Sequence, residues 1–207
     1  MAAMEVIAER GVLGASVEAI CDAAGYTRGA FYSNFSSRDE LCVAIMERQL
    51  ERNLVVLGET VAQTPALGAL SVDDLIHRAV ATFLATQPSD RTSVLTAQEL
   101  QLYAAREPAF GPTYHAMYLK GLQTVSDILV DALAERGYEL TTSADQAIST
   151  LFAVFTHGEV SALITGDTVQ GDERTERLAQ VVRSLIRPTS ERPAGSAGPA
   201  ISWTSGR

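Results

Sequence analysis

The sequence predicts an all-α protein with a small N-terminal helical domain and a larger C-terminal helical domain. Apolar residues recur at helical spacing through nearly every segment. No segment alternates apolar and polar residues between turn signals, as a half-buried strand does. The chain has 207 residues, 46% of them hydrophobic, which is enough for two small cores but too short for a large multidomain enzyme.

Three short helices are expected at the N-terminus. The first covers about residues 2–10 and stops at a glycine, which tolerates a left-handed backbone. The second begins after Ser16, a good N-cap, and ends at Gly25. Thr27 can cap a third helix that runs to about Asn34. The second and third helices therefore have the proportions of a helix-turn-helix.

A longer fourth helix is expected to connect the two domains. Ser37 and Glu40 have the spacing of a capping box, in which a hydroxyl and a carboxylate reciprocally satisfy free backbone amides. An apolar stripe then continues to about Glu59, where a loop with proline and glycine follows. We place residues 1–50 in the first domain and residues 51–187 in the second.

Proline and glycine residues divide the second domain into further helices. These helices are expected over residues 72–86, 93–106, 112–136, 144–165 and 173–187. The last of them carries an apolar face that a neighbouring helix or a partner subunit must cover. Residues 188–207 are rich in proline, glycine and serine, which predicts a disordered tail.

Composition and charge indicate which binding partners and which cellular location to expect. The net charge of −9 is the opposite of what a nonspecific nucleic-acid binder needs, although a few converging arginines could still serve a sequence-specific one. The N-terminus lacks an export signal and the longest apolar stretches are too short for a membrane span, so we expect a cytoplasmic protein. Cys21 and Cys42 lack metal-ligand spacing and fit buried helical positions, so neither a metal nor another cofactor is predicted.

The third helix has a polar side that no packing role explains. Its outward residues are expected to be Thr27, Arg28, Gly29, Ala30, Tyr32, Ser33 and Asn34. The apolar residues around it can form a three-helix core: Val6, Ile7, Val17, Ile20, Cys21, Phe31 and Phe35. Small residues allow close backbone approach to DNA, and arginine can reach guanine edges or phosphates in the major groove. The competing interpretation is a small helical bundle with no nucleic-acid role.

The segment SVEAICDAAGYTRGAFYSNFSSRDELCVAIM closely resembles the signature of the TetR family of bacterial regulators. The matching positions are Ser16, Ala23, Ala24, Gly25, Gly29, Tyr32, Phe35 and Arg38. By this resemblance, Ser16, Tyr32 and Arg38 would contact phosphates. The bases would face Thr27, Arg28, Gly29 and Ala30. Arg38 stands where the family more often has lysine, and Asn34 where it often has histidine.

The start of the chain departs from the family pattern. Family members usually carry a basic arm and a longer first helix, whereas acidic residues outnumber basic ones in the first 52 positions here. Either a basic segment lies upstream of Met1, or DNA binding is weak without an arm. We favour the upstream segment, because residues 4–9 enter the helical pattern partway.

The resemblance also implies a C-terminal domain that forms a homodimer, binds a small-molecule effector and holds two recognition helices for a palindromic operator in double-stranded DNA. The expected dimer-interface residues are Leu151, Phe155, Gly158, Ala162, Leu178, Val181, Val182 and Leu185. Aromatic and polar residues of the same domain predict a pocket for a mostly apolar effector. The pocket candidates are Phe83, Gln98, Leu102, Tyr103, Phe110, Tyr114, His115, Tyr118, Phe152, Phe155 and His157.

Two other classes of function stay open at this point. The chain could be a ligand-binding or protein-interaction module whose helix-turn-helix ignores DNA. An enzyme is the third class, with acid-base candidates at Glu99, Glu107, His115, His157 and Glu159. No nucleophile motif, phosphate loop or metal spacing accompanies these five residues, so a repressor that an effector releases is the preferred hypothesis.

Overall fold

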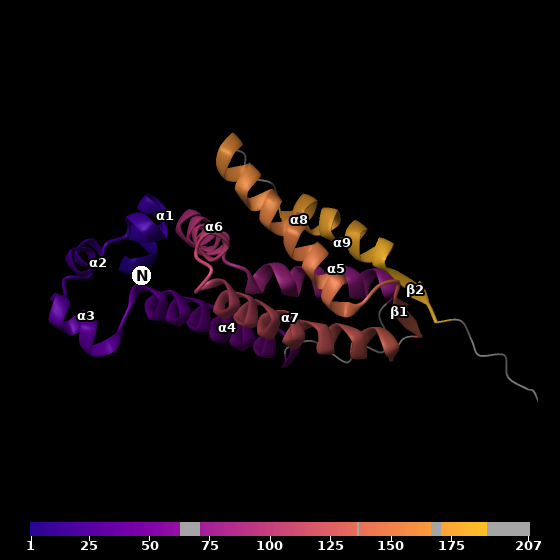
Figure 1. Ribbon diagram of the computed structural model, residues 1–207. Coiled ribbons are helices and arrows are strands. Elements are labelled where there is room, and N and C mark those ends of the chain that lie inside the picture. Colours follow the sequence, from indigo (N-terminus) through magenta and orange to yellow (C-terminus); the bar gives the residue numbers. More distant parts are fainter. Residues whose placement is uncertain (63–70, 136, 167–170, 190–207) are drawn as a thin grey trace, which may run out of the picture.

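The computed structural model describes residues 1–62, 71–135, 137–166 and 171–189. Figure 1 shows an elongated molecule, with α1 to α3 at one end and a short β-ribbon at the other. The expected all-α fold with an N-terminal helix-turn-helix is confirmed. The predicted tail lies almost entirely outside the described residues.

The helix-turn-helix follows its local capping signals. Helix α2 (Val17–Ala24) begins where Ser16 Oγ accepts a hydrogen bond from Ala19 N at 3.1 Å. It ends at Gly25, whose φ of 70° places it in the left-handed region. Helix α3 (Arg28–Asn34) begins where Thr27 Oγ1 accepts from Ala30 N at 3.2 Å.

Helix α1 (Ala2–Gly14) continues beyond its predicted end but kinks there. Gly11 has φ 71° and ψ 164°, so the backbone leaves the helix for one residue and then resumes it. A Cβ at this position would lie 2.7 Å from Oε2 of Glu99 in α6 (Arg91–Arg106), the end of a flexible side chain that would have to move. The glycine therefore redirects the helix instead of ending it.

Helix α4 (Arg38–Ala62) has a different cap from the predicted box. Ser37 Oγ accepts from Glu40 N at 3.2 Å, as expected. The Glu40 carboxylate accepts at 2.6 Å from both the backbone N and Oγ of Ser36, and not from Ser37 N. The helix runs without a break across the boundary predicted after residue 50.

The C-terminal helices end close to their predicted limits. They are α5 (Val72–Thr86), α6, α7 (Gly111–Ala134), α8 (Ala144–Thr165) and α9 (Gly171–Leu185). The expectation of no strand is wrong at one place, because β1 (Tyr138–Leu140) pairs antiparallel with β2 (Ile186–Pro188). Three-residue strands are too short to show alternation in a sequence, and their pairing joins segments far apart in the chain.

Two apolar clusters hold the molecule together. The first includes the predicted three-helix core, but Leu100, Tyr103 and Phe110 also belong to it. Helix α6 and the start of α7 are thus built into the helix-turn-helix core. Cys21 and Cys42 are buried there as expected, and burial raises the pKa of the Cys42 thiol to about 12. The second cluster joins α5, α8 and α9.

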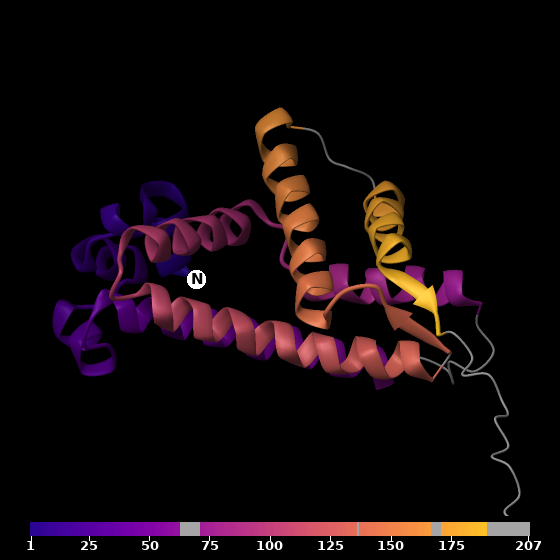
Figure 2. The same cartoon turned by 45° about the vertical axis from the view of Figure 1, so that its right-hand side comes forward.

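Helix α8 is long and apolar but poorly covered. Its most apolar 18-residue window has a mean hydropathy of 1.4, and only 11% of that window is buried. In Figure 2 its C-terminal half stands away from the neighbouring helices. By length and composition alone α8 could span a membrane, which the sequence analysis did not anticipate because polar residues interrupt its apolar stretches.

Candidate functional site

Helix α3 has one buried side and one open side. Phe31 is buried and its ring meets that of Phe35 at a centroid distance of 5.5 Å, which anchors the helix to the core. Tyr32 points outward and is 51% exposed. The other predicted DNA-contact residues of this region are also exposed, except for the half-buried Ala30; they are Ser16, Thr27, Arg28, Gly29, Ser33 and Asn34.

Two of the polar side chains on α3 bond to the helix itself. Ser33 Oγ donates to Ala30 O at 2.9 Å, and Asn34 Nδ2 donates to the same carbonyl at 2.8 Å. Both bonds end on the carbonyl of the third residue of this seven-residue helix. Both side chains would have to exchange these bonds to donate to a nucleic acid.

Gly29 has no packing partner that requires a glycine. A Cβ built at this position would meet only Thr27 Oγ1, at an ordinary contact distance of 3.7 Å. The open space above residue 29 allows another backbone to approach α3 closely.

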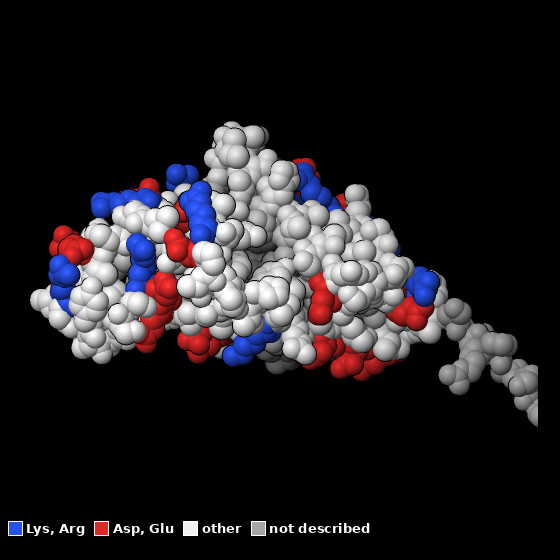
Figure 3. All heavy atoms as spheres, in the orientation of Figure 1, with Lys and Arg blue, Asp and Glu red and all other residues white. Residues whose placement is uncertain are grey.

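Arg28 is held by an acidic residue of the preceding helix. Its Nη1 lies 2.6 Å from Glu18 Oε1, and both side chains are exposed. A backbone hydrogen bond, followed by the charge of Arg28, lowers the pKa of Glu18 below its usual range. Figure 3 shows basic and acidic side chains interspersed over the end of the molecule that carries α1 to α3.

Arg38 is directed into the protein, unlike the other predicted phosphate contacts. Its Nη1 donates to Val12 O at 3.1 Å and to Leu13 O at 3.2 Å, at the end of α1. Its guanidinium carbon lies 5.6 Å from the centroid of the Tyr103 ring, and its buried Nε has no hydrogen-bond partner in the described structure. Nη1 of the half-buried Arg38 is thus engaged by backbone carbonyls inside the fold, and its contact with a phosphate stays a prediction.

A polar junction joins the helix-turn-helix to α6. Tyr103 OH donates to Asp39 Oδ1 at 2.6 Å, and the buried Thr96 Oγ1 donates to Met4 O at 3.0 Å. Sequence analysis assigned Tyr103 to the effector pocket and Glu99 to acid-base chemistry, but both lie in this junction. It did not identify Thr96 or Asp39, since only tertiary packing brings them together.

The predicted effector-pocket residues fall into separate groups. Tyr103, Phe110 and Tyr114 form a chain of ring contacts in the first cluster. In the second cluster, Phe83 makes edge-to-face contacts with Phe155 and also with Phe152 beside it. Of the other candidates, Tyr118 OH bonds to Ser149 Oγ, Gln98 is half-buried, and Leu102, His115 and His157 are exposed.

A cleft of about 380 Å³ opens between α8 and α9. Phe155 is the predicted effector contact that lines it, together with Glu159 and Arg174. The predicted dimer residues Gly158 and Ala162 also line this cleft.

The predicted dimer face of α9 is mostly covered within the chain. Leu178 and Val182 are buried against Ile76 and Val80 of α5. They were predicted to lie at the subunit interface because the apolar stripe of α9 must pack against another helix. In the structure that helix is α5 of the same chain. Leu151 and Phe155 also pack on this cluster, while Val181 and Leu185 remain half-buried.

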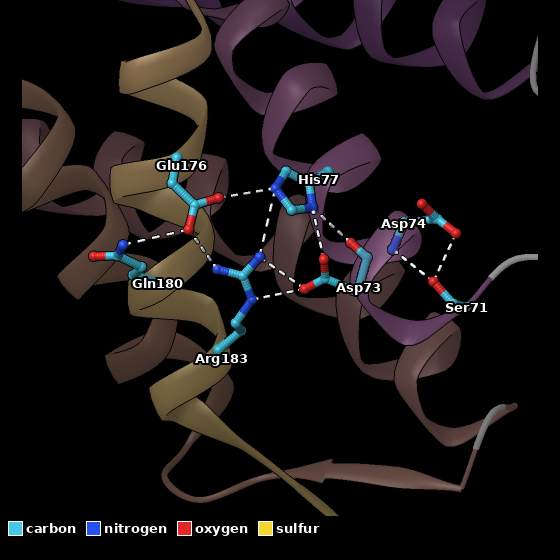
Figure 4. A network of polar contacts seen from close by, with 7 residues as sticks. All are labelled: Ser71, Asp73, Asp74, His77, Glu176, Gln180 and Arg183. Atoms are coloured by element: carbon cyan, nitrogen blue, oxygen red, sulfur yellow. Dashed lines mark hydrogen bonds and ion pairs between the residues drawn. The ribbon is translucent and has the colours of Figure 1, made fainter.

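A second polar network links α5 to α9 (Figure 4). Arg183 Nε donates to Asp73 Oδ1 at 2.7 Å, and its Nη1 donates to Glu176 Oε1 at 2.9 Å. His77 places Nδ1 2.9 Å from Asp73 O and Nε2 3.0 Å from Glu176 Oε2. Both ring nitrogens face acceptors, which the imidazolium can donate to, while Arg183 Nη2 also lies 3.5 Å from Nε2 and opposes a charge on the ring.

These contacts raise the pKa of the histidine in the network and lower the pKa of the glutamate. The Asp73 carbonyl and the Glu176 carboxylate raise the pKa of His77. Hydrogen bonds from Arg183 and His77 lower the pKa of Glu176 to about 2. Within the described ranges, no group of three His, Cys, Asp or Glu side chains is arranged to hold a metal ion.

Comparisons with known proteins agree with the helix-turn-helix geometry. Residues 1–45 match the family model described as bacterial regulatory proteins, tetR family. The nicotine-responsive transcriptional repressor HdnoR of Paenarthrobacter nicotinovorans is 28% identical over 131 residues, which are 63% of this chain. The match spans 65% of the length of that repressor, slightly less than two thirds.

Solved structures share the fold over most of the chain. FadR of Bacillus subtilis, a transcriptional regulator solved with stearoyl-CoA, superposes with a TM-score of 0.66 and 15% identity and covers 88% of this chain and 92% of its own. A TetR-like regulator from Rhodococcus sp. RHA1 has a TM-score of 0.59 and 19% identity, with 88% and 90% covered. A regulator from Saccharomonospora viridis in complex with choline has a TM-score of 0.62 and 16% identity, with 90% and 94% covered.

Proposed function

We propose that the chain is a TetR-family, sequence-specific repressor that a small effector releases from its operator, since residues 1–45 match the tetR family model. The observation that carries this proposal is the open side of α3. Helix α3 exposes Arg28, Gly29 and Tyr32 on one side, and the buried Phe31 anchors its other side to the core. Such a helix can enter the major groove with its backbone close to the bases.

The proposed contacts divide into two kinds. Thr27, Arg28, Gly29 and Ala30 face the bases, and they set the sequence preference. Ser16, Tyr32, Ser33 and Asn34 contact the sugar-phosphate backbone, which positions the helix without reading sequence. Arg38 acts indirectly in this proposal, because it holds the end of α1.

A homodimer would supply the second recognition helix for a palindromic operator. Support comes from α8, whose apolar surface is poorly covered within one chain and whose Ile164 is 78% exposed. A second copy packed along α8 would bury this surface, and Leu178 and Val182 would support the interface from inside. This assignment of α8 also favours a cytoplasmic protein over a membrane-bound one.

The effector would act through α6. This helix shares the first apolar cluster with α1 to α4 and is bonded to them through Thr96 and Tyr103. An effector that shifts α6 would therefore change the placement of the recognition helices and favour a conformation that no longer fits the operator. The relatives named above bind or respond to chemically different compounds, namely nicotine, stearoyl-CoA and choline, so they do not select one effector.

Selection of a randomised duplex library by the purified chain tests the proposal. The expected result is a palindromic motif that is lost in Arg28→Ala, since Arg28 reads the bases. Tyr32→Phe should weaken all duplexes by a similar factor. No enrichment, either by this chain or by one with a basic N-terminal extension, would overturn the proposal in favour of a ligand-binding module that ignores DNA.

A further inference from the structure

Glu18 is fixed at the start of α2, the helix that precedes the recognition helix. It lies in the first turn of α2, where the free backbone amides of the helix end stabilise a negative charge. A hydrogen bond from its own backbone, the charge of Arg28 and the Ser16 hydroxyl lower the pKa of its carboxyl, so the group is ionised at neutral pH. A fixed anion therefore lies beside the first residue of α3.

Arg28 contacts this anion with one of its two terminal nitrogens. Its Nη1 lies 2.6 Å from Glu18 Oε1. Among the described residues, no other side chain pairs with Arg28, so the edge formed by Nε and Nη2 keeps its N–H groups free. Two parallel N–H donors match O6 and N7 of guanine in the major groove. The ion pair thus leaves the guanidinium with an edge that can bind guanine.

The ion pair restricts a long and flexible side chain. The Arg28 side chain is 60% exposed and that of Glu18 is 52% exposed, so the pair contributes little to the stability of the fold. Its effect is on the orientation of Arg28, since a side chain that is already held loses less conformational entropy when it binds a base.

We propose that Glu18 is a positioning residue for sequence recognition, which holds Arg28 Nη1 and directs the Nε–Nη2 edge towards a guanine. This inference rests on the proposed function, in which Arg28 faces the bases. At a guanine, Arg28 shares its donors between Glu18 and the base. At another base, the held guanidinium cannot turn to a nearby phosphate, so its free edge lacks acceptors and binding is weaker.

Asp22 separates the effect of this contact from the effect of charge. A carboxylate near the DNA repels phosphates whatever the base sequence, so it lowers the affinity for every duplex by a similar factor. Asp22 lies one helical turn after Glu18 on α2 and is also exposed. Within the part of the chain that the structure describes, no side chain pairs with Asp22. It is therefore the matched control.

Anisotropy titration of the full chain against three duplexes tests the proposal. They are the palindrome that the wild type selects, the same duplex with an A·T pair in place of one G·C pair, and one with 7-deazaguanine, which lacks N7. The relevant guanine is the one whose replacement weakens binding of the wild type but not of Arg28→Ala. The wild type should prefer this guanine over adenine by about tenfold or more.

Glu18→Gln should reduce this preference by about threefold or more, because it strengthens binding to the two altered duplexes more than binding to the palindrome. Asp22→Asn should strengthen binding to all three duplexes similarly and leave the preference unchanged. In the Arg28→Ala background, Glu18→Gln should not alter the preference, because Glu18 acts only through Arg28. Each preference is a ratio within one variant, so a difference in stability does not imitate this pattern.

A guanine preference that Glu18→Gln leaves unchanged would overturn this proposal, while the proposed repressor function would stand. Equal losses of preference in Glu18→Gln and Asp22→Asn would also overturn it, because they would identify a general effect of charge. A change at a different base position, or one that persists in Arg28→Ala, would identify a direct base contact of Glu18 instead. Selection of no palindrome, with or without a basic N-terminal extension, would overturn both proposals.

Discussion

Arg28 and Glu18 form an ion pair across the helix-turn-helix, with arginine Nη1 2.6 Å from glutamate Oε1. The arginine proposed to read bases is therefore partly neutralised in the free protein. Because both side chains are exposed, the pair itself adds little stability. Its main effect is expected on DNA binding, where Arg28 must leave Glu18 or share its donors between Glu18 and a base.

Glu18→Gln is expected to increase the affinity for duplex DNA by about two- to fivefold, because it removes a negative charge near the phosphates and releases Arg28. Fluorescence anisotropy at fixed ionic strength measures this change. Glu139→Gln is the matched control, since Glu139 pairs with Arg187 at 2.8 Å in the β-ribbon at the other end of the molecule. Equal gains in the two variants would mean that net charge, and not the position of Glu18, determines the effect.

Gly29→Ala is expected to separate DNA binding from stability. The free protein has room for the methyl group, and alanine is more favourable than glycine in a helix by up to about 1 kcal/mol. The free energy of unfolding should stay constant or rise, while operator affinity should fall about tenfold or more because the methyl group prevents close approach to the bases. Urea denaturation and anisotropy give the two values. Unchanged operator affinity would contradict the proposed orientation of α3.

Arg38→Gln tests whether Arg38 supports the fold or contacts phosphate. Loss of its bonds to the carbonyls of Val12 and Leu13 and of its ring contact should reduce the free energy of unfolding by about 1–3 kcal/mol. All duplexes should bind more weakly, with an unchanged dependence of affinity on salt. A salt slope reduced by about one would instead identify a direct phosphate contact.

Tyr103→Phe examines the same junction from α6. It removes the hydroxyl, with its hydrogen bond to Asp39 and its interaction with Arg38, and should cost about 1 kcal/mol of stability. Tyr118→Phe is the matched control, because it removes the bond to Ser149 within the C-terminal domain. An effect on DNA release in Tyr103→Phe but not in Tyr118→Phe would support α6 as the coupling element.

The pH dependence of stability should reveal the contact between α5 and α9. Because folding raises the pKa of His77, its stabilising contribution is complete below the unfolded pKa of about 6.5 and is lost as the pH rises through the folded value. Glu176 acts in the opposite direction, because its pKa is lowered from 4.5 to about 2 and its contribution is lost as the pH falls between these values.

Thermal denaturation of the wild type and His77→Gln between pH 5 and pH 8 measures the histidine part. The wild type should lose stability relative to His77→Gln over the upper part of this range. His157→Gln, at an exposed site on α8, is the control and should follow the wild type. Parallel curves for all three proteins would contradict a stabilising role for protonated His77.

The local signals of the sequence were sufficient for most of the helices and for the open side of α3. Ser16, Gly25 and Thr27 determine where helices begin or end through bonds within a few residues, so their roles follow from the sequence. The buried position of Phe31 likewise follows from its place in an apolar pattern. Short-range capping and periodicity therefore predicted the helix-turn-helix with only small errors, at Gly11 and Glu40.

Tertiary structure alone decided the direction of Arg38, the separation of the predicted pocket residues and the pairing of Glu159 with Arg174. These features depend on contacts between different helices, some of them far apart in sequence, as for Tyr103 and Asp39, whose numbers differ by 64. A helical pattern shows that a side chain lies on an apolar or polar face, but not which neighbouring helix covers that face. Leu178 illustrates the difference. The apolar stripe of its helix predicted that Leu178 is buried against another helix, and only the structure shows that this helix is α5 of the same chain.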